Sequence, residues 1–258
     1  MSAADVAPYA LPASGQVQVG TFVKTTAPQV IEILGLAGLD FAVLDAEHAP
    51  WDRGALDLAM LAGRAARLPL LVRVPERSAA AILGVLDLGA AGVVVPHVDS
   101  ADDARDVVAW ARYVGGRRGY SSSPRAAGYG TLGMAETIDR ADRAVVIVQI
   151  ESEAAVAAAH EIVAVPGVAG VLVGRADLAL SMGLVSTQHQ RVVAATAQVV
   201  QATLAAGRVL GVAVGTDAER KSFIAQGARW VVQGSDQSLL RQAAAALKAD
   251  QRSATRAS

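Results

Sequence analysis

The chain has 258 residues, of which 53 % are hydrophobic and 18 % charged, and its formal net charge is −1. This composition excludes a disordered chain, and the scattered basic residues argue against nucleic acid as a partner. The absence of cysteine excludes disulfides, thiolate catalysis and cysteine-ligated zinc. The sequence shows neither a signal-peptide pattern nor an apolar run long enough to span a membrane, so we expect a soluble, cytoplasmic protein without a membrane partner.

Eight short runs rich in β-branched residues are apolar at nearly every position, which is typical of strands buried on both faces of a parallel sheet. Longer helical patterns alternate with these runs, and glycine often follows them, where it suits a left-handed cap. The predicted strands are residues 16–23, 40–45, 68–74, 91–98, 144–150, 168–174, 208–214 and 228–234. The predicted helices are residues 28–38, 54–67, 78–90, 101–114, 153–165, 190–207, 217–228 and 238–249.

This alternation, over a chain of this length, predicts an α/β fold with a single domain, a (β/α)8 TIM barrel covering residues 1–258. An open doubly wound sheet gives the same alternation and is the alternative. We expect residues 1–15 to form a flexible extension and residues 249–258 a flexible tail. The long connection at residues 114–143 is typical of a functional lid or a disordered segment.

Polar residues follow the carboxyl ends of the predicted strands, whereas the strand beginnings are mostly apolar or glycine. Chemistry in such barrels lies at the carboxyl ends of the strands, so this asymmetry predicts one polar mouth. The residues concerned are Lys24, Asp45, Glu47, His48, Arg73, His97, Gln149, Glu151, Arg175 and Asp177.

Glu151 and Asp177 follow consecutive predicted strands. Parallel neighbours lie about 4.8 Å apart, so the two carboxylates can converge on one point. An oxygen-rich site without cysteine suits Mg²⁺ or Mn²⁺ better than zinc. The alternative is that Glu151 only stabilises the start of the following helix.

Four further residues near the strand ends leave their roles open. Arg73 lies in an apolar strand and needs an anionic partner, which is either an internal carboxylate or a substrate oxyanion. Asp45 stands three residues before His48 and could orient its imidazole as a general base, although a loop histidine is usually only solvent-exposed. Lys24, the only lysine near a predicted strand end, leaves a Schiff-base mechanism open.

These residues lie in ordered stretches that together resemble a known family. The chain is similar, from about residue 20 to residue 245, to the metal-dependent (class II) pyruvate aldolases. That family includes 4-hydroxy-2-oxoheptanedioate aldolase and 2-keto-3-deoxy sugar-acid aldolases and is related to the citrate lyase β subunit. The stretches are GTFVKTTAPQVIEILGLAGLDFAVLDAEHAP, LVRVPE, LDLGAAGVVVPHVDSADDA, GGRRGYSSSPRA, VQIES and GVLVGRADLALSMG.

The resemblance implies reversible cleavage of a 4-hydroxy-2-oxo acid into pyruvate and an aldehyde through a metal-bound pyruvate enolate. It implies a barrel assembled as a hexamer, a trimer of dimers, with the last helix exchanged between neighbouring subunits. The divalent metal would be Mg²⁺, Mn²⁺ or Co²⁺, held by Glu151 and Asp177. The matching catalytic residues are the base His48, its dyad partner Asp45 and the essential Arg73.

The resemblance also implies a site for the carboxylate of pyruvate. The matching residues are Gln149 beside the metal, Gly174, Ala176, Asp177 and a serine that is either Ser122 or Ser123. Many members have proline where this chain has Arg175, which either alters the mouth or pairs with an acid. Many have glycine where it has Ala46, and both departures concern substrate choice more than chemistry.

Two other functions remain open. One is a carbon–carbon lyase acting on an acyl-CoA, whose phosphates Arg117, Arg118 and Arg125 could contact. The other is a barrel that serves as a non-catalytic scaffold, against which Glu151, Asp177, Arg73 and His48 argue. Glu47 and His97 receive no role from the sequence.

Overall fold

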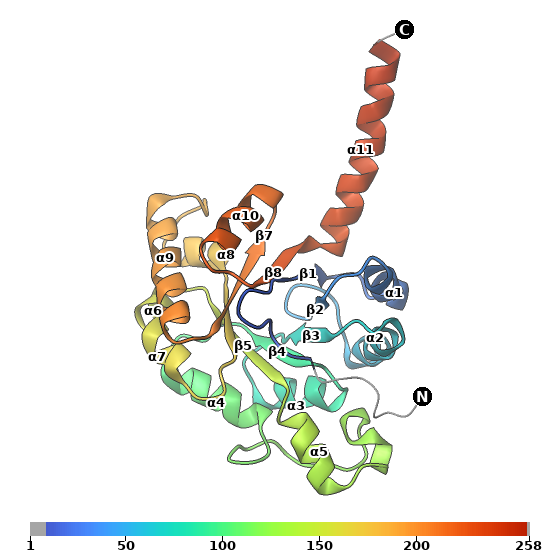
Figure 1. Ribbon diagram of the computed structural model, residues 1–258, viewed down its shortest axis with the longest axis vertical. Helices are drawn as coiled ribbons and strands as arrows, with labels where there is room; N and C mark the ends of the chain where they lie inside the picture. The colour runs from blue at the N-terminus through green and yellow to red at the C-terminus, as the bar shows by residue number, and fades with distance from the viewer. Residues whose placement is uncertain (1–8, 257–258) are drawn as a thin grey trace.

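The computed structural model describes the backbone of residues 9–256 and the side chains of residues 9–248. Eight parallel strands form a closed barrel in chain order, with the helices around it (Figure 1). The strands are β1 (Gln18–Val23), β2 (Phe41–Asp45), β3 (Leu70–Arg73), β4 (Gly92–Val95), β5 (Val145–Ile150), β6 (Gly170–Val173), β7 (Val209–Val214) and β8 (Trp230–Ser235).

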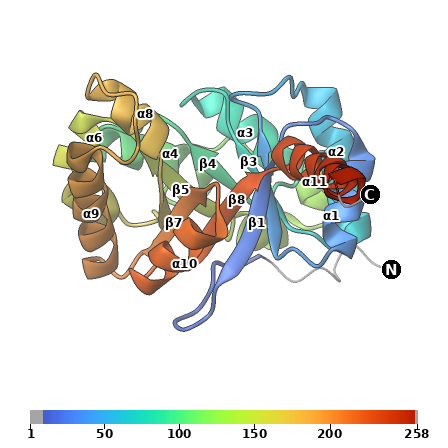
Figure 2. The same ribbon diagram turned by 90° about the horizontal axis from the view of Figure 1, so that it is seen from above.

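In Figure 2, α1 and α2 lie on one side of the strands and α6, α8 and α9 lie on the other. Ser78, Ser100, Ser152 and Thr216 each accept a hydrogen bond from a first-turn amide, which explains where four helices begin. The helices are α1 (Pro28–Leu36), α2 (Arg53–Ala66), α3 (Ala79–Asp87), α4 (Ala101–Ala111), η1 (Arg125–Gly130), α5 (Met134–Ala141), α6 (Glu153–Ala157), α7 (Ala159–Ala164), α8 (Arg175–Ser181), α9 (Gln190–Ala205), α10 (Asp217–Ala225) and α11 (Asp236–Arg256).

The eight predicted strands and the TIM barrel are confirmed. Pairing of β1 with β8 closes the sheet and rules out the open alternative. The helix predicted at 153–165 is two helices, because the chain leaves the helical conformation at Ala158. The long connection at 114–143 contains η1 and α5, and α8 was not predicted at all.

The barrel interior is filled by large apolar side chains. The rings of Phe41 and Trp230 stack with their centroids 4.5 Å apart. Gly20 makes room for this pair, since a Cβ there would lie 2.5 Å from the Phe41 carbonyl oxygen. The other members of the interior cluster are Val43, Leu71, Val94, Val145, Ile147, Leu172 and Val232.

Both predicted flexible ends are described only in part. Residues 1–8 of the predicted extension lie outside the described residues, whereas Tyr9 donates to Gln18 Oε1 at 2.7 Å and accepts from Trp230 Nε1 at 2.9 Å. At the other end α11 continues to Arg256 and extends away from the barrel (Figure 1), and residues 257–258 lie outside the described residues. None of the helices described here is long and apolar enough to cross a membrane.

Candidate active site

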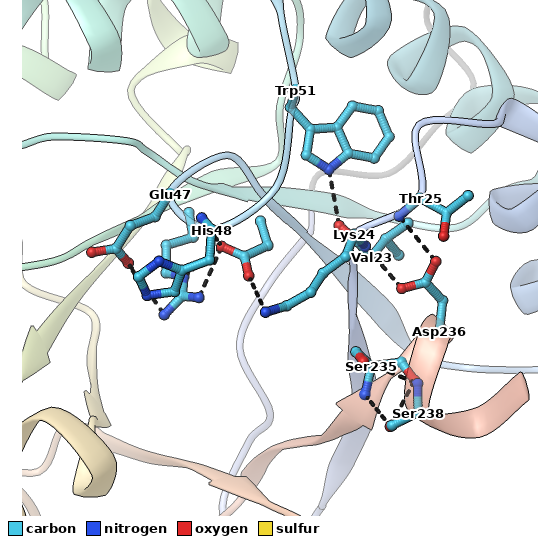
Figure 3. Close-up of polar contacts among 11 residues, drawn as sticks. Val23, Lys24, Thr25, Glu47, His48, Trp51, Ser235, Asp236 and Ser238 are labelled. Atoms are coloured by element: carbon cyan, nitrogen blue, oxygen red, sulfur yellow. Dashed lines mark hydrogen bonds and ion pairs between the residues drawn. The ribbon is translucent and has the colours of Figure 1, made fainter. Parts of the chain in front are cut away.

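The predicted polar mouth lies at the carboxyl ends of the strands. The backbone pairing of β2 with β3 sets Asp45 opposite Arg73. Near the seam between β1 and β8, the carboxylate of Asp236 accepts hydrogen bonds from the backbone amides of Lys24 at 2.8 Å and Thr25 at 3.1 Å (Figure 3). The first residue of α11 therefore holds the loop that carries Lys24.

Asp45 is the buried centre of a charge cluster. Its Oδ1 accepts from Arg73 Nε at 2.9 Å and lies 2.8 Å from Arg73 Nη2, while Oδ2 lies 3.1 Å from Lys24 Nζ. Burial opposes ionisation of this carboxyl, but the charge and hydrogen bonds of Arg73 and Lys24 hold its pKa below the ordinary value. Asp45 therefore fixes two cationic side chains, those of Arg73 and Lys24.

The orientation expected for Asp45 and His48 differs from the one observed. Asp45 Oδ1 accepts from the backbone amide of His48 at 3.2 Å and not from its ring. The side chains of Arg73 and Lys24 are the ion-pair partners of the Asp45 carboxylate. The His48 ring is half exposed, and its Nε2 lies 3.7 Å from Glu47 Oε2.

Glu47, which the sequence left without a role, lies close to the side chains of Arg73, His48 and His97. Its carboxylate oxygens are 3.2 Å from Arg73 Nη1 and 3.3 Å from His97 Nε2. Burial raises the pKa of Glu47; Arg73 and the histidines oppose this effect, and the nearby charge of Glu151 adds to it. Arg73 thus has internal carboxylate partners, and its guanidinium also lies 4.6 Å from the centroid of the Phe22 ring.

Glu151 is 3 % exposed and is held on both oxygens. Oε1 accepts from the backbone amide of His97 at 2.8 Å, and the side-chain amide of Gln149 donates to Oε2. His97 has a φ of 55°, a left-handed conformation that costs free energy in a residue other than glycine. This conformation accompanies the contact of both its amide and its ring Nδ1 with Glu151 Oε1.

A cavity of about 190 Å³ lies beside this carboxylate, at the ends of β5, β6 and β7. A Cβ at Gly174 would lie 2.7 Å from Glu151 Oε2, so glycine leaves this oxygen its space. Asp177 lies in the first turn of α8, where backbone amides lack intrahelical partners. The lining residues are Phe22, Arg73, Gln149, Leu172, Val173, Gly174, Arg175, Ala176, Asp177, Thr187 and Ala213.

The donors at this cavity fit a hard divalent cation. Glu151 and Asp177 offer carboxylate oxygens, and Gln149 Oε1 is buried with no hydrogen-bond partner among the described residues. Within residues 9–248 there is no cluster of three or more histidine, cysteine or acidic side chains arranged to hold a metal. Two carboxylates would therefore leave coordination positions for substrate and water, which is how Mg²⁺ is usually bound.

Two further predicted features have different outcomes. Arg175 pairs with an acid, Glu219 of α10, at 3.0 Å. Ser122 and Ser123 are exposed, and neither lines the described cavity. The segment that follows them, η1, packs on α3 and not at the mouth.

Phe22 and Thr187 line the cavity but were not singled out from the sequence. Phe22 occupies the penultimate position of β1. Its position at a strand end is a signal in the sequence, but only polar residues at strand ends were considered as candidates. Thr187 lies in the irregular segment between α8 and α9, where no sequence pattern marks it.

Comparison with known proteins matches residues 18–243 to the family model described as HpcH/HpaI aldolase/citrate lyase. The chain is 35 % identical over 234 residues to 5-keto-4-deoxy-D-glucarate aldolase of Shigella dysenteriae, covering 90 % of this chain and 91 % of that one. The equivalent protein of Klebsiella pneumoniae is equally similar.

Solved structures agree with this match. An HpcH/HpaI family protein from Burkholderia cenocepacia superposes with a TM-score of 0.88 at 31 % identity, over 92 % of this chain and 95 % of that chain. An HpcH/HpaI aldolase from Desulfitobacterium hafniense gives a TM-score of 0.85 at 29 % identity, over 92 % and 94 % of the two chains. The chain therefore belongs to the HpcH/HpaI aldolase/citrate lyase family and is a carbon–carbon lyase.

Proposed function

We propose that this enzyme reversibly cleaves a 4-hydroxy-2-oxo acid into pyruvate and an aldehyde. The observation that carries the proposal is the position of Arg73 and Asp177 on one cavity, beside the buried carboxylate of Glu151. A guanidinium and a hard-cation site on one cavity suit the development of negative charge on a substrate oxygen. The named relatives in Shigella and Klebsiella make 5-keto-4-deoxy-D-glucarate the first substrate to assay.

Glu151 and Asp177 would hold a divalent cation, Mg²⁺, Mn²⁺ or Co²⁺. When bound, such a cation supplies Lewis-acid polarisation of the 2-oxo group. Gln149 fixes one oxygen of Glu151 through its side-chain amide, and the His97 amide fixes the other. The first-turn amides at Ala176 and Asp177, next to Gly174, would receive the carboxylate of pyruvate.

In the cleavage direction the C3–C4 bond of the substrate breaks. The proton of the 4-hydroxyl passes to the imidazole of His48 as the aldehyde carbonyl forms, and the bonding electrons move to the 2-oxo oxygen. Arg73, fixed by Asp45 and Glu47, stabilises that developing charge. Protonation at C3 of the resulting enolate then releases pyruvate.

The contacts of Lys24 argue against a Schiff-base mechanism. Its Nζ lies 3.1 Å from Asp45 Oδ2, and Lys24 is not among the residues that line the cavity shared by Arg73 and Asp177, so its amine is held away from a substrate bound there. The test measures pyruvate formation after chelation and again after addition of Mg²⁺ or Mn²⁺. We expect loss and recovery; activity that resists the chelator and is trapped by borohydride on Lys24 would overturn the proposal.

The acyl-CoA alternative receives no support from the positions of its candidate arginines. Arg118 pairs with Asp87 at the end of α3, and Arg125 pairs with Asp57 of α2. Neither lines the cavity at the mouth. Pyruvate release from an acyl-CoA but not from a 4-hydroxy-2-oxo acid would reverse this ranking, and absence of metal binding by calorimetry would favour a non-catalytic scaffold.

We also propose that the subunits form a homo-oligomer, a hexamer arranged as a trimer of dimers, in which α11 packs on a neighbour. The main contacts of α11 within its own chain are with β1 and β8, and it extends beyond the barrel (Figure 1). Leu240 and Leu247 on this helix are each 73 % exposed. Light scattering on the intact protein and on the L240D/L247D variant tests the assembly, and a monomeric wild-type protein would refute it.

A further inference from the structure

The end of the barrel opposite the mouth contains two adjoining cavities of about 250 and 160 Å³. Pro69 and Ala91, which precede β3 and β4, line the larger one, and Ala144, which precedes β5, lines the smaller one. Since catalysis uses the carboxyl ends of the strands, these cavities are distinct from the candidate active site. The residues that the two cavities share are Tyr9, Gly89, Ala91, Ala126 and Arg140.

Among the described residues, arginines are the only charged side chains in the linings of both cavities. Neither lining contains an aspartate or glutamate among the described residues, although the whole chain has a net charge of −1. The arginines concerned are Arg64, Arg67, Arg118, Arg125, Arg140 and Arg143.

Four of these six arginines have acidic partners that lie outside the linings. Arg64 and Arg67, which lie at the end of α2, have no acidic partner within the part of the chain that the structure describes. The ion pairs are Arg118 with Asp87, Arg125 with Asp57, Arg140 with Glu136, and Arg143 with Asp139.

Arg125 is the most buried of the arginines that line the larger cavity. Its side chain is only 9 % exposed, and its Nε is buried with no hydrogen-bond partner among the described residues. Buried N–H groups in proteins are normally paired with an acceptor. The Nε of Arg77, Arg118 and Arg175 is unpaired in the same way, so the contribution of Arg125 is its position in the wall of the larger cavity, where its Nη2 donates to Asp57 Oδ1 at 2.6 Å.

The ends of neighbouring helices explain part of the positive charge but not all of it. α2, α3 and α5 all end at this side of the barrel, and a helix carboxyl end carries about half a negative charge that attracts cations. The helix dipole accounts for exposed cations in the last turn of a helix, but it does not account for a cavity beside them. The apolar side chains of Met60, Leu70 and Leu132 in the same lining indicate space for the body of an organic molecule.

We propose that these cavities form a binding site for a small organic anion that carries at least two phosphate or carboxylate groups on a short apolar frame. The guanidinium groups of Arg64, Arg67 and Arg125 bind its oxygens, because arginine matches the geometry of both groups. Met60, Leu70 and Leu132 contact its apolar part. The site does not depend on the proposed aldolase reaction.

The test is calorimetric titration of the intact, metal-free protein in EDTA, with inorganic pyrophosphate and with citrate as probes. We expect one site per subunit for at least one probe, with an affinity that falls as NaCl is raised. Tighter binding of pyrophosphate identifies phosphate as the preferred group, and tighter binding of citrate identifies carboxylate. Absence of saturable binding by both probes overturns the proposal.

The variant R64Q/R67Q should weaken binding at least tenfold, and both positions are exposed, so the fold should be retained. The matched control is R105Q/R191Q, which removes two exposed arginines on α4 and α9 and should bind as the wild type does. The K24Q variant should also retain binding. If K24Q lost binding while R64Q/R67Q bound as the wild type does, the anion would lie at the mouth and the proposal would be overturned.

Discussion

Arg175 donates a hydrogen bond to Glu219 Oε1 at 3.0 Å and another to the Ala213 carbonyl oxygen at 3.1 Å. Its guanidinium also lies 4.8 Å from the centroid of the Phe223 ring. These contacts tie the first turn of α8, which carries Asp177, to β7 and α10. An arginine at this position therefore fixes the helical turn that bears one of the two carboxylates proposed to bind metal.

The first prediction concerns metal affinity. R175Q should weaken binding of Mn²⁺ about tenfold, which corresponds to about 1.4 kcal/mol, because the first turn of α8, which carries Asp177, loses its anchors. Calorimetry measures this directly, without activity as the readout. R191Q, which removes an exposed arginine paired with Glu153, serves as the control and should bind Mn²⁺ as the wild type does. Equal affinity in R175Q and wild type would show that Arg175 does not position the first turn of α8.

The second prediction concerns the space around Glu151. In G174A the new Cβ would lie 2.6 Å from Glu151 Cβ and 2.7 Å from its Oε2, so the carboxylate must move. We expect at least a hundredfold loss of Mn²⁺ affinity, about 2.7 kcal/mol, with the far-UV circular dichroism unchanged. G133A is the control, because nothing lies within 4 Å of a Cβ there. Retention of wild-type metal binding in G174A would contradict the assigned position of Glu151.

The third prediction concerns stability. The side chains of Arg73 and Asp45 are 8 % and 0 % exposed. Removal of the cation in R73Q leaves a buried anion and should lower the free energy of unfolding by about 3 to 5 kcal/mol. R73K keeps the charge but not the planar fork that spans Asp45 and Glu47, so its loss should be intermediate. Urea denaturation of the metal-free protein measures both, and an unchanged midpoint in R73Q would refute a structural role for this pair.

The fourth prediction concerns pH. The pKa of Glu47 is raised above its ordinary value of 4.5 by burial, so the native state holds this proton more tightly than the unfolded chain does. Native stability therefore decreases as the pH rises above 4.5 and Glu47 ionises. The pKa of Asp45 is lowered, so this residue loses its contribution only in more acidic solution, below its ordinary value of 3.8.

The free energy of unfolding of E47Q relative to wild type should consequently rise between pH 4.5 and pH 7. Urea midpoints of the metal-free protein at several pH values measure this difference. E161Q, which changes an exposed carboxylate on α7, is the control, and its difference from wild type should stay flat. A difference that falls with pH in E47Q would mean that the native state prefers the ionised form of Glu47.

The strands were predictable because burial on both faces makes a parallel strand apolar at nearly every position, and β2 and β5, which are buried along their whole length, have only Asp45 and Gln149 as polar residues. The helix α5 was missed because its short segment MAETIDRA lies among glycines in a connection that reads as irregular. α8 was missed because the residues Arg175–Ser181 were interpreted by their chemistry and not by their helical pattern. Short helices gain much of their stability from tertiary packing, which local sequence does not record.

The composition of the site was predictable from strand order, but its contacts were not. The rule that chemistry lies at strand ends singled out Asp45, Arg73 and Glu151. It gave no reason for Asp45 to contact Lys24 and Arg73 instead of the His48 ring, since this depends on cross-strand register. Nor does a sequence show that His97 adopts a left-handed conformation and directs its amide at Glu151.

The hydrogen bonds from Lys24 and Thr25 to Asp236 join residues that lie 212 and 211 positions apart in the chain. A ribosome makes the chain from its N-terminus, so β1 and the Lys24 loop emerge long before the carboxylate that fastens them. Lys24 and Asp45 are synthesised early. The loop that carries Lys24, however, gains its hydrogen bonds to Asp236 only after that residue has left the exit tunnel. The mouth is thus among the last parts of the molecule to be completed during synthesis, and fragments that end before α11 should lack an ordered catalytic site.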